Sequence, residues 1–131
     1  MMMRGVRGAT TVHENDAGAI LAATQELLQQ IVGLNGITEE TVASVLFTTT
    51  PDLNAVYPAA AARAMGWHRV ALMGFQEIQI PNGINFCIRV LIHWNTEKSI
   101  DEIKHVYMHG ATKLRPDLYP DNRIVLNEEK S

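Results

Sequence analysis

INFCIRVLIHWN, residues 84–95, decides the fold because it reads as one long β-strand with a single charge at its centre. Side chains alternate between the two faces of a strand, so the wholly apolar face here predicts part of the core. That face consists of Ile84, Phe86, Ile88, Val90, Ile92 and Trp94, and the opposite face of Asn85, Cys87, Arg89, Leu91, His93 and Asn95. A guanidinium keeps its charge when buried, so Arg89 on a central strand needs a carboxylate partner or an anionic ligand. The stretch by itself leaves a structural ion pair and an anion site both open.

Length and composition predict a single globular domain. The chain has 131 residues, 47% of them hydrophobic and 19% charged, which is ordinary for a soluble protein. We expect one domain over residues 1–118 and a flexible, solvated tail over 119–131. The net charge is −3 and the 11 basic residues are scattered, so the clustered basic face of a nucleic-acid-binding protein is absent from the sequence.

The sequence also argues against a membrane protein and against a metal or other cofactor. It has no apolar run as long as a membrane span and no signal-peptide core at its start, so we expect a cytoplasmic protein. Its single cysteine, Cys87, excludes an internal disulfide, and its place within a strand favours packing over nucleophilic catalysis. His105 and His109 are four residues apart on a predicted helix, but the carboxylate of a zinc motif is missing.

The rest of the pattern predicts an α+β domain. Expected strands are residues 4–12, 43–50, 68–73 and 75–80, with Gly74 interrupting between the last two. Expected helices run from an Asn15 or Asp16 cap to Gly33 or Gly36, over 58–66, and over 99–110. This order predicts a mixed sheet with helices on one face. Because the other face would be too apolar to stay wet, we expect the sheets of several copies to pack together.

A short turn predicts a carboxylate partner for the central arginine. The connection Pro81-Asn82-Gly83 is typical of a hairpin, so residues 75–80 should pair antiparallel with the strand that carries Arg89. That pairing would bring Glu77 within a residue or two of Arg89.

Four arginines at separate positions suggest a site for a small dianion. Arg7, Arg63, Arg89 and Arg115 accompany Glu77 and Tyr107, with no evident nucleophile or general base. Arginine binds carboxylates through two parallel hydrogen bonds, so such a set suits a dicarboxylate. It also suits a reaction that is stabilised electrostatically rather than through a covalent intermediate.

Several motifs carry a resemblance to a known family. RGVRGATT, TTTPDLNAVYPA, QEI followed by CIRVLIHWNT, and HVYMHGATKLRPDL occur in this order over residues 3–118. The sequence thereby resembles the AroH class of monofunctional chorismate mutases, the Bacillus type. The resemblance implies a homotrimer with three active sites between adjacent subunits. It implies conversion of chorismate to prephenate in phenylalanine and tyrosine biosynthesis, without a cofactor or metal.

The resemblance also implies roles for individual residues. Arg7 and Tyr107 would hold the enolpyruvyl carboxylate, Arg89 would donate to the ether oxygen and a carboxylate, and Glu77 would bind the ring hydroxyl. Tyr57, Ala59 and Arg63 would come from the neighbouring subunit. The remaining expected substrate contacts are Leu72, Met73 and Leu114 lining the cavity, Gly74 beside the ring hydroxyl, and Arg115 closing the site.

Three positions depart from the best-known family pattern. Ala60 stands where a lysine can assist carboxylate binding, Gly74 stands where a cysteine contacts the ring hydroxyl, and Tyr57 replaces phenylalanine. The first two departures remove peripheral contacts and would weaken substrate affinity. They leave in place the arginine and the glutamate that the chemistry needs.

Two other functions are compatible with an arginine in a cleft. Rid-type imine deaminases, which are also trimers, place an arginine between subunits for a carboxylate. A non-catalytic trimer that senses small anions would bind the same ligands without turnover. The combination of Arg7, Glu77, Arg89 and Tyr107 favours the mutase over both alternatives.

Overall fold

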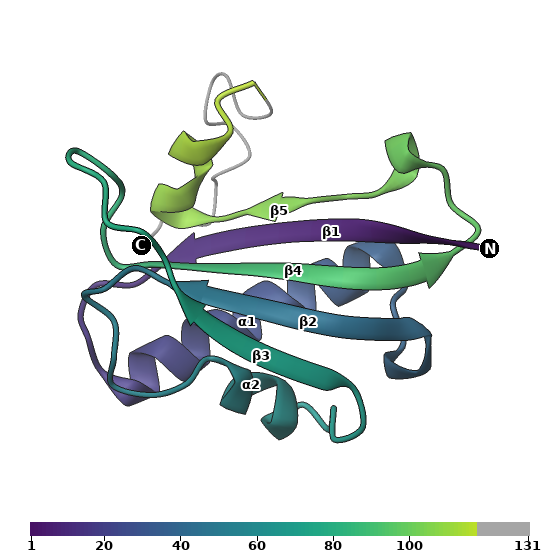
Figure 1. Cartoon of the computed structure of the whole chain (residues 1–131), viewed down its shortest axis with the longest axis horizontal. Helices are drawn as coiled ribbons and strands as arrows, with labels where there is room; N and C mark the ends of the chain where they lie inside the picture. The colour runs from purple at the N-terminus through teal and green to yellow at the C-terminus, as the bar shows by residue number, and fades with distance from the viewer. Residues whose placement is uncertain (118–131) are drawn as a thin grey trace.

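The computed structural model describes residues 1–117 as one five-stranded mixed sheet with both α-helices on one face (Figure 1). The strands are β1 (Met2–Thr11), β2 (Val42–Thr49), β3 (Ala71–Gln76), β4 (Cys87–Thr96) and β5 (Val106–Tyr107), in the spatial order β3-β2-β4-β1-β5. β4 runs antiparallel to β1 and β2, whereas β3 runs parallel to β2 and β5 runs parallel to β1. The predicted α+β class and the helices on one face are confirmed. The predicted tail, 119–131, lies outside the described residues.

β4, the strand that carries Arg89, is the central strand of this sheet. Within β4 its apolar face is buried as predicted, because Ile88 and Ile92 are fully inaccessible and Val90 and Trp94 are nearly so. The predicted start at residue 84 is wrong: Ile84 and Phe86 precede the strand and are only half-buried. These side chains, with those of neighbouring strands, meet the apolar stripe of α1. Burying a side chain of this size contributes about 1.5–3 kcal/mol, so the face that β4 turns to the helix is a main source of stability.

Helix α1 (Ala17–Asn35) begins and ends where its sequence signals predict. The Asp16 carboxylate accepts a hydrogen bond of 2.9 Å from the backbone N–H of Ala19, which caps the first turn. Gly36 ends the helix in a left-handed conformation with φ of 74°. The second helix, α2 (Ala59–Ala64), follows Pro58 and lies beside α1 behind β3 (Figure 1).

The predicted hairpin before β4 is wrong. β3 includes Gly74 without interruption, ends at Gln76 and pairs in parallel with β2, which separates it from β4. Residues 77–86 form an irregular connection instead, with Asn82 at a positive φ of 65°. The chain does turn at Asn82-Gly83, but the backbone hydrogen bonds of β3 are made with β2 instead of with β4.

The predicted helix over residues 99–110 is also wrong. Ser99 and Glu102 do form the expected capping box, but the helix is one short 3₁₀ turn, η2 (Ile100–Glu102). The amide of Asn35 then binds both the N–H and the C=O of Lys104, each at 2.9 Å, which holds the chain extended. The chain continues into β5 and a second 3₁₀ segment, η3 (His109–Leu114). Contacts with residues far along the chain therefore override the local helical signal in residues 99–110. A third 3₁₀ turn, η1 (Glu39–Thr41), lies elsewhere in the fold, before β2.

The second face of the sheet, called the open face below, has neither α-helix on it (Figure 1). Strand registers place these residues on it: Arg7, Ala9, Leu46, Thr48, Met73, Phe75, Arg89, Leu91 and His93. Met73 is 58% exposed and Phe75 48% exposed. The face thus carries exposed apolar side chains beside Arg7, Thr48, Arg89 and His93, and its coverage by other copies stays a prediction. No helix in the described part of the chain is long and apolar enough to cross a membrane.

Replacing Gly8 of β1 by alanine should destabilise the fold. An added Cβ would lie 2.5 Å from Cδ1 of Ile31 and 3.2 Å from Cδ1 of Leu27, both on α1 in the core. We expect the free energy of unfolding to fall by about 1–3 kcal/mol, the usual cost of overpacking. The matched control is Gly33→Ala in α1, where nothing lies within 4 Å and removal of glycine should stabilise by about 0.5–1 kcal/mol. Urea unfolding measures both, and an unchanged Gly8→Ala would contradict the close packing.

Candidate functional site

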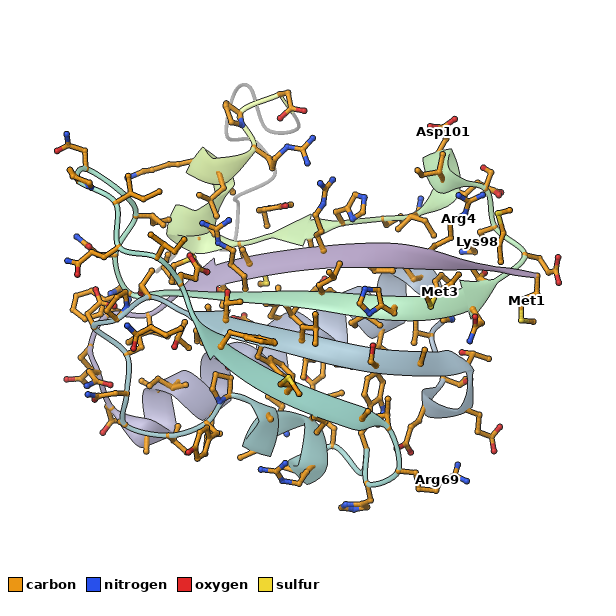
Figure 2. All side chains as sticks on the ribbon, viewed as in Figure 1. Met1, Met3, Arg4, Arg69, Lys98 and Asp101 are labelled. Carbon is orange, nitrogen blue, oxygen red and sulfur yellow. The ribbon has the colours of Figure 1, made fainter. Side chains whose placement is uncertain are left out.

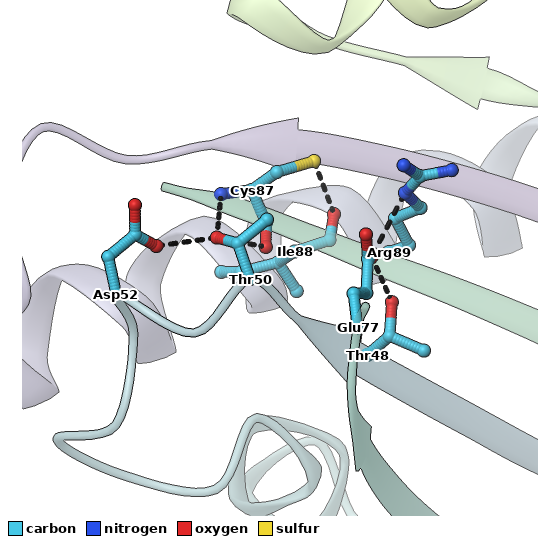
Figure 3. A network of polar contacts seen from close by, with 7 residues as sticks. All are labelled: Thr48, Thr50, Asp52, Glu77, Cys87, Ile88 and Arg89. Carbon is cyan, nitrogen blue, oxygen red and sulfur yellow. Dashed lines mark hydrogen bonds and ion pairs between the residues drawn. The ribbon is translucent and has the colours of Figure 1, made fainter. Parts of the chain in front are cut away.

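Arg89 forms an ion pair with Glu77 on the open face, as the sequence analysis expected. Nε of Arg89 lies 3.0 Å from Oε2 of Glu77, and the Thr48 hydroxyl donates a hydrogen bond to the same carboxylate oxygen (Figure 3). The arginine side chain is 44% exposed in the single chain, so it is less buried than the central position had suggested. The glutamate is only 16% exposed. The charge at the centre of the sheet thus has a carboxylate partner that is held in place by a third residue.

Strand registers explain how Glu77 reaches Arg89 without a hairpin. Thr48 of β2 lies opposite Arg89 on one side and opposite Phe75 on the other. The backbone N–H of Glu77 then donates to the Thr49 carbonyl at 2.9 Å, which extends the β2–β3 ladder by one residue. Glu77 therefore falls on the same face as Thr48 and Arg89, across one intervening strand.

These residues line an open cleft of about 1040 Å³. Its floor includes Thr48, Glu77 and Arg89, and its wall is the irregular connection that follows β3. Within that connection Ile78 is 87% exposed and Ile80 is 64% exposed. The cleft thus combines one fixed cation, the two carboxylates of Glu77 and Asp52, and exposed apolar side chains on the connection.

A second polar network fixes the beginning of β4 near the cleft (Figure 3). Both carboxylate oxygens of Asp52 accept from the backbone N–H of Phe86, which has an unusual positive φ of 51°. The Thr50 hydroxyl donates to Asp52 at 2.6 Å and accepts from the backbone N–H of Cys87 at 2.9 Å. Because Arg89 follows two residues later, this network helps to set where the arginine leaves the sheet.

Cys87 is a packing residue, as predicted. It is fully buried in a cluster with Ala9, Tyr107 and Ala111. Burial raises the pKa of its thiol to about 12, with the negative charge of Glu77 adding to this and Arg89 opposing it. A thiol with that pKa stays protonated at neutral pH and is a poor nucleophile.

Arg7, Tyr107 and Arg115 extend the site toward the β5 edge of the sheet. Arg7 faces Leu91, two residues from the Ala9–Arg89 pair, so the two arginines are diagonal neighbours on the open face. Tyr107 pairs with Ala9 in the parallel ladder. Beyond η3, Arg115 makes two hydrogen bonds with Asp117, at 3.0 and 2.7 Å. Those bonds raise the pKa of its guanidinium, with a smaller contribution from the Tyr107 hydroxyl.

Leu114 completes this first group of expected site residues. It packs against the cluster that contains Ala9, Cys87 and Tyr107. Of the six expected residues in this group, Glu77 and Arg89 line the cleft. Arg7 neighbours Arg89 through the strand register, and Tyr107, Leu114 and Arg115 lie beyond it toward the β5 edge, outside the cleft lining.

The other expected site residues lie elsewhere, along β3 and α2. Tyr57 and Gly74 line a separate hollow of about 540 Å³. Ala59 is buried in the main core, Leu72 is half-buried against it, and Arg63 is exposed on α2. Met73 lies on the open face. We call Tyr57, Ala59, Arg63, Leu72, Met73 and Gly74 the β3-edge group; within one chain they do not line the Arg89 cleft.

The two histidines considered as a metal pair are on different elements. His109 begins η3 and lies 3.3 Å from Glu26 of α1, whereas His105 precedes β5 and accepts from the Arg7 backbone. Among residues 1–117, no group of three or more histidine, cysteine, aspartate or glutamate side chains is arranged to hold a metal ion.

Sequence reasoning missed Thr48 and Asp52 as supporting residues. Thr48 was assigned only to a strand, and its link to Glu77 depends on a parallel pairing that joins residues 29 apart. No role is predicted for Asp52 from the sequence. Its place in the TTTPDL motif was the one available signal, but its hydrogen bond to Phe86 spans 34 residues.

Known proteins resemble this chain along most of its length. The family model described as chorismate mutase type I matches residues 3–118. Chorismate mutase AroH of Thermus thermophilus is 48% identical over 118 residues, covering 89% of this chain and 97% of the relative. Chorismate mutase AroH of Bacillus subtilis (strain 168) is 43% identical over 119 residues, covering 90% and 94%. A solved chorismate mutase structure from Clostridium thermocellum is 48% identical with a TM-score of 0.83, covering 84% of this chain and 98% of that one.

Proposed function

The chain belongs to the chorismate mutase type I family, and from that premise we propose how its residues convert chorismate to prephenate. The activity is that of a chorismate mutase, an isomerase of aromatic amino-acid biosynthesis. The observation that carries the proposed mechanism is Arg89, a permanent cation held by Glu77 in a cleft at the centre of the sheet. Membership of this family favours the mutase over the two alternatives, an imine deaminase and a non-catalytic anion sensor.

The reaction needs position and charge rather than proton transfer. One C–O bond of the ether breaks while one C–C bond forms in the same molecule, so atoms and electrons balance without a second reactant. A site can accelerate this step by holding the flexible dianion in its compact reactive conformation. It can accelerate it further by placing positive charge where the ether oxygen becomes negative.

We assign the second task to Arg89. Its Nε contacts Glu77 while the terminal nitrogens extend away from that carboxylate (Figure 3). The fork of terminal N–H donors is then oriented toward the developing charge before the reaction begins, which avoids reorganisation in the transition state. Glu77 serves as the orienting partner of Arg89 and as the acceptor for the ring hydroxyl of the substrate.

The remaining cations would bind the substrate carboxylates. Arg7 is the diagonal neighbour of Arg89 on the open face, and Arg115 is near Tyr107 at the sheet edge. Arginine and tyrosine donors near one another suit a carboxylate, and Leu114, which packs against the cluster of Tyr107, supplies apolar contact. We propose that Arg7 and Tyr107 hold the enolpyruvyl carboxylate and that Arg115 closes the site.

We propose further that the β3-edge group completes the active site of an adjacent subunit in a homotrimer. Within one chain Arg63 and Tyr57 lie apart from the Arg89 cleft, and Tyr57 is 78% exposed. Exposed Met73 and Phe75 on the open face supply apolar surface for packing between copies. A cyclic arrangement in which one copy's β3 edge meets the next copy's cleft gives each site two halves.

The departures at Ala60, Gly74 and Tyr57 fall within or beside this second half. Gly74 leaves open space at its Cα, since the nearest atom to an added Cβ is the Phe47 carbonyl oxygen at 4.0 Å. We therefore expect weaker substrate affinity than in relatives with a lysine and a cysteine there. Residues 1–118 are proposed as the catalytic domain, and the cytoplasmic location stays a prediction.

Replacing Arg89 by lysine should abolish most of the activity. Lysine keeps the charge but loses the planar fork, so it cannot contact Glu77 and the ether oxygen together. We expect turnover to fall by more than about a hundredfold, the scale of removing one oxyanion donor. The loss of chorismate absorbance measures the rate directly.

The matched control is Arg69→Lys, at an exposed arginine that projects from the edge of the molecule (Figure 2). It should leave turnover unchanged. Near-normal prephenate formation by Arg89→Lys would contradict the role assigned to Arg89.

Two inactive variants should restore each other if the active site has halves from two subunits. Arg63→Ala and Arg89→Ala should each lose activity alone. Every mixed cyclic trimer of the two contains one site with both arginines, so random equal mixing should recover about a quarter of wild-type activity. Refolding the two proteins together and assaying chorismate loss measures the recovery.

A mixture of Glu77→Ala and Arg89→Ala is the control, because both residues lie in the same half and no intact site can form. Light scattering after size exclusion should report a trimer for every variant. Activity in the control mixture, or none in the Arg63 and Arg89 mixture, would contradict the shared site.

A further inference from the structure

His105 makes a direct hydrogen bond to the backbone of a substrate-binding arginine. The backbone N–H of Arg7 donates to Nδ1 of His105 at 3.0 Å. His105 immediately precedes β5, whose ladder with β1 consists of the pairs Gly8–Val106 and Ala9–Tyr107. At Arg7, the next residue of β1, the backbone N–H is bound by the His105 side chain instead of by a backbone carbonyl of β5. The imidazole therefore continues the β1–β5 ladder by one hydrogen bond.

This contact determines the protonation state of the ring. A backbone N–H can only donate, so Nδ1 must be the unprotonated nitrogen and a neutral ring carries its proton on Nε2. A doubly protonated imidazole has no acceptor and would lose the bond to Arg7. The hydrogen bond thus exists only with neutral His105.

The surrounding charges favour the same neutral state. Partial burial lowers the pKa of His105 below its ordinary value, and the positive charges of Arg7 and Arg115 lower it further. Arg7 belongs to β1 and Arg115 follows η3, where Asp117 pairs with it and the Tyr107 hydroxyl lies near it. A charged imidazole would add a third positive charge near the two arginines that the proposed mechanism uses for carboxylates.

We propose that His105 is a positioning residue for substrate binding, which fixes the backbone of Arg7 through a hydrogen bond that only the neutral imidazole accepts. The proposal rests on the proposed function, in which Arg7 binds a carboxylate of chorismate. His105 acts through Arg7 and lies outside the set of residues assigned to the reacting bonds.

Two substitutions of His105 distinguish the effect of the hydrogen-bond acceptor from the effect of the size of the side chain. His105→Asn places an amide oxygen where Nδ1 accepts, whereas His105→Leu keeps an apolar side chain and removes the acceptor. We expect KM of the leucine variant to rise about five- to tenfold while kcat changes less than about twofold, since one ground-state contact is lost. The asparagine variant should keep KM within about twofold of wild type. His68→Leu, at an exposed histidine to which no role in the site is assigned, is the control and should change neither constant.

The pH dependence of stability supplies a second readout. The folded-state pKa of His105 is lowered, so its contribution to stability is complete above its ordinary value of 6.5 and is lost as the pH falls through the folded-state pKa. His105→Asn has no such titration. The Tm of wild type relative to His105→Asn should therefore decrease between about pH 7.5 and about pH 5.

Each outcome decides the proposal. A raised KM in His105→Leu with rescue by His105→Asn supports it, and so does the acid-dependent Tm difference. A wild-type KM in His105→Leu, an asparagine variant as impaired as the leucine variant, or parallel Tm profiles would overturn it. Arg7→Ala distinguishes this failure from failure of the proposed function, because an active Arg7→Ala contradicts the role of Arg7 itself whatever His105 does.

Discussion

The site is arranged around a permanent positive charge, Arg89, on the central strand of the sheet. Arg89 needs a fixed anion, and Glu77 supplies it from the far side of β2 at 3.0 Å. Thr48 holds the same carboxylate oxygen, and the Asp52 network holds the beginning of β4. A charge fixed by its neighbours in this way is arranged before the substrate arrives, which is what electrostatic catalysis of an intramolecular rearrangement requires.

The same sheet separates stability from function by face. The face toward α1 carries the buried apolar residues of β4, and the open face carries the arginines. This division follows from the alternation of side chains along a strand, so one stretch of sequence specifies both a core and a site. Gly8 lets α1 approach β1 closely, and the preceding residue, Arg7, is on the open face.

The sequence predicted the parts of the molecule that depend on local periodicity. The alternation in β4, the caps of α1 and the one-sided helices were correct because the signals lie within a few residues of their effect. The predictions of a hairpin and of a helix over 99–110 were wrong because residues far along the chain form hydrogen bonds with these segments. β2 pairs with β3, and the Asn35 side chain binds the backbone of Lys104. The pairing of Glu77 with Arg89 was still predicted correctly. Both the predicted hairpin and the observed pairing of β3 with β2 place Glu77 on the same face of the sheet as Arg89. Thr48, Asp52 and His105 were missed as supporting residues because their roles depend on contacts that span 29 or more residues.

The proposed mechanism depends most on where the terminal nitrogens of Arg89 bind. A crystal structure of the enzyme with an unreactive dicarboxylate that mimics the compact conformation of chorismate tests this directly. We predict a terminal nitrogen of Arg89 at about 3 Å from the ether oxygen of the analogue, with Nε still on Glu77 and Arg63 of a neighbouring subunit in the same site. An analogue bound away from the cleft, or an Arg89 that contacts Glu77 alone, would contradict the central role of this arginine.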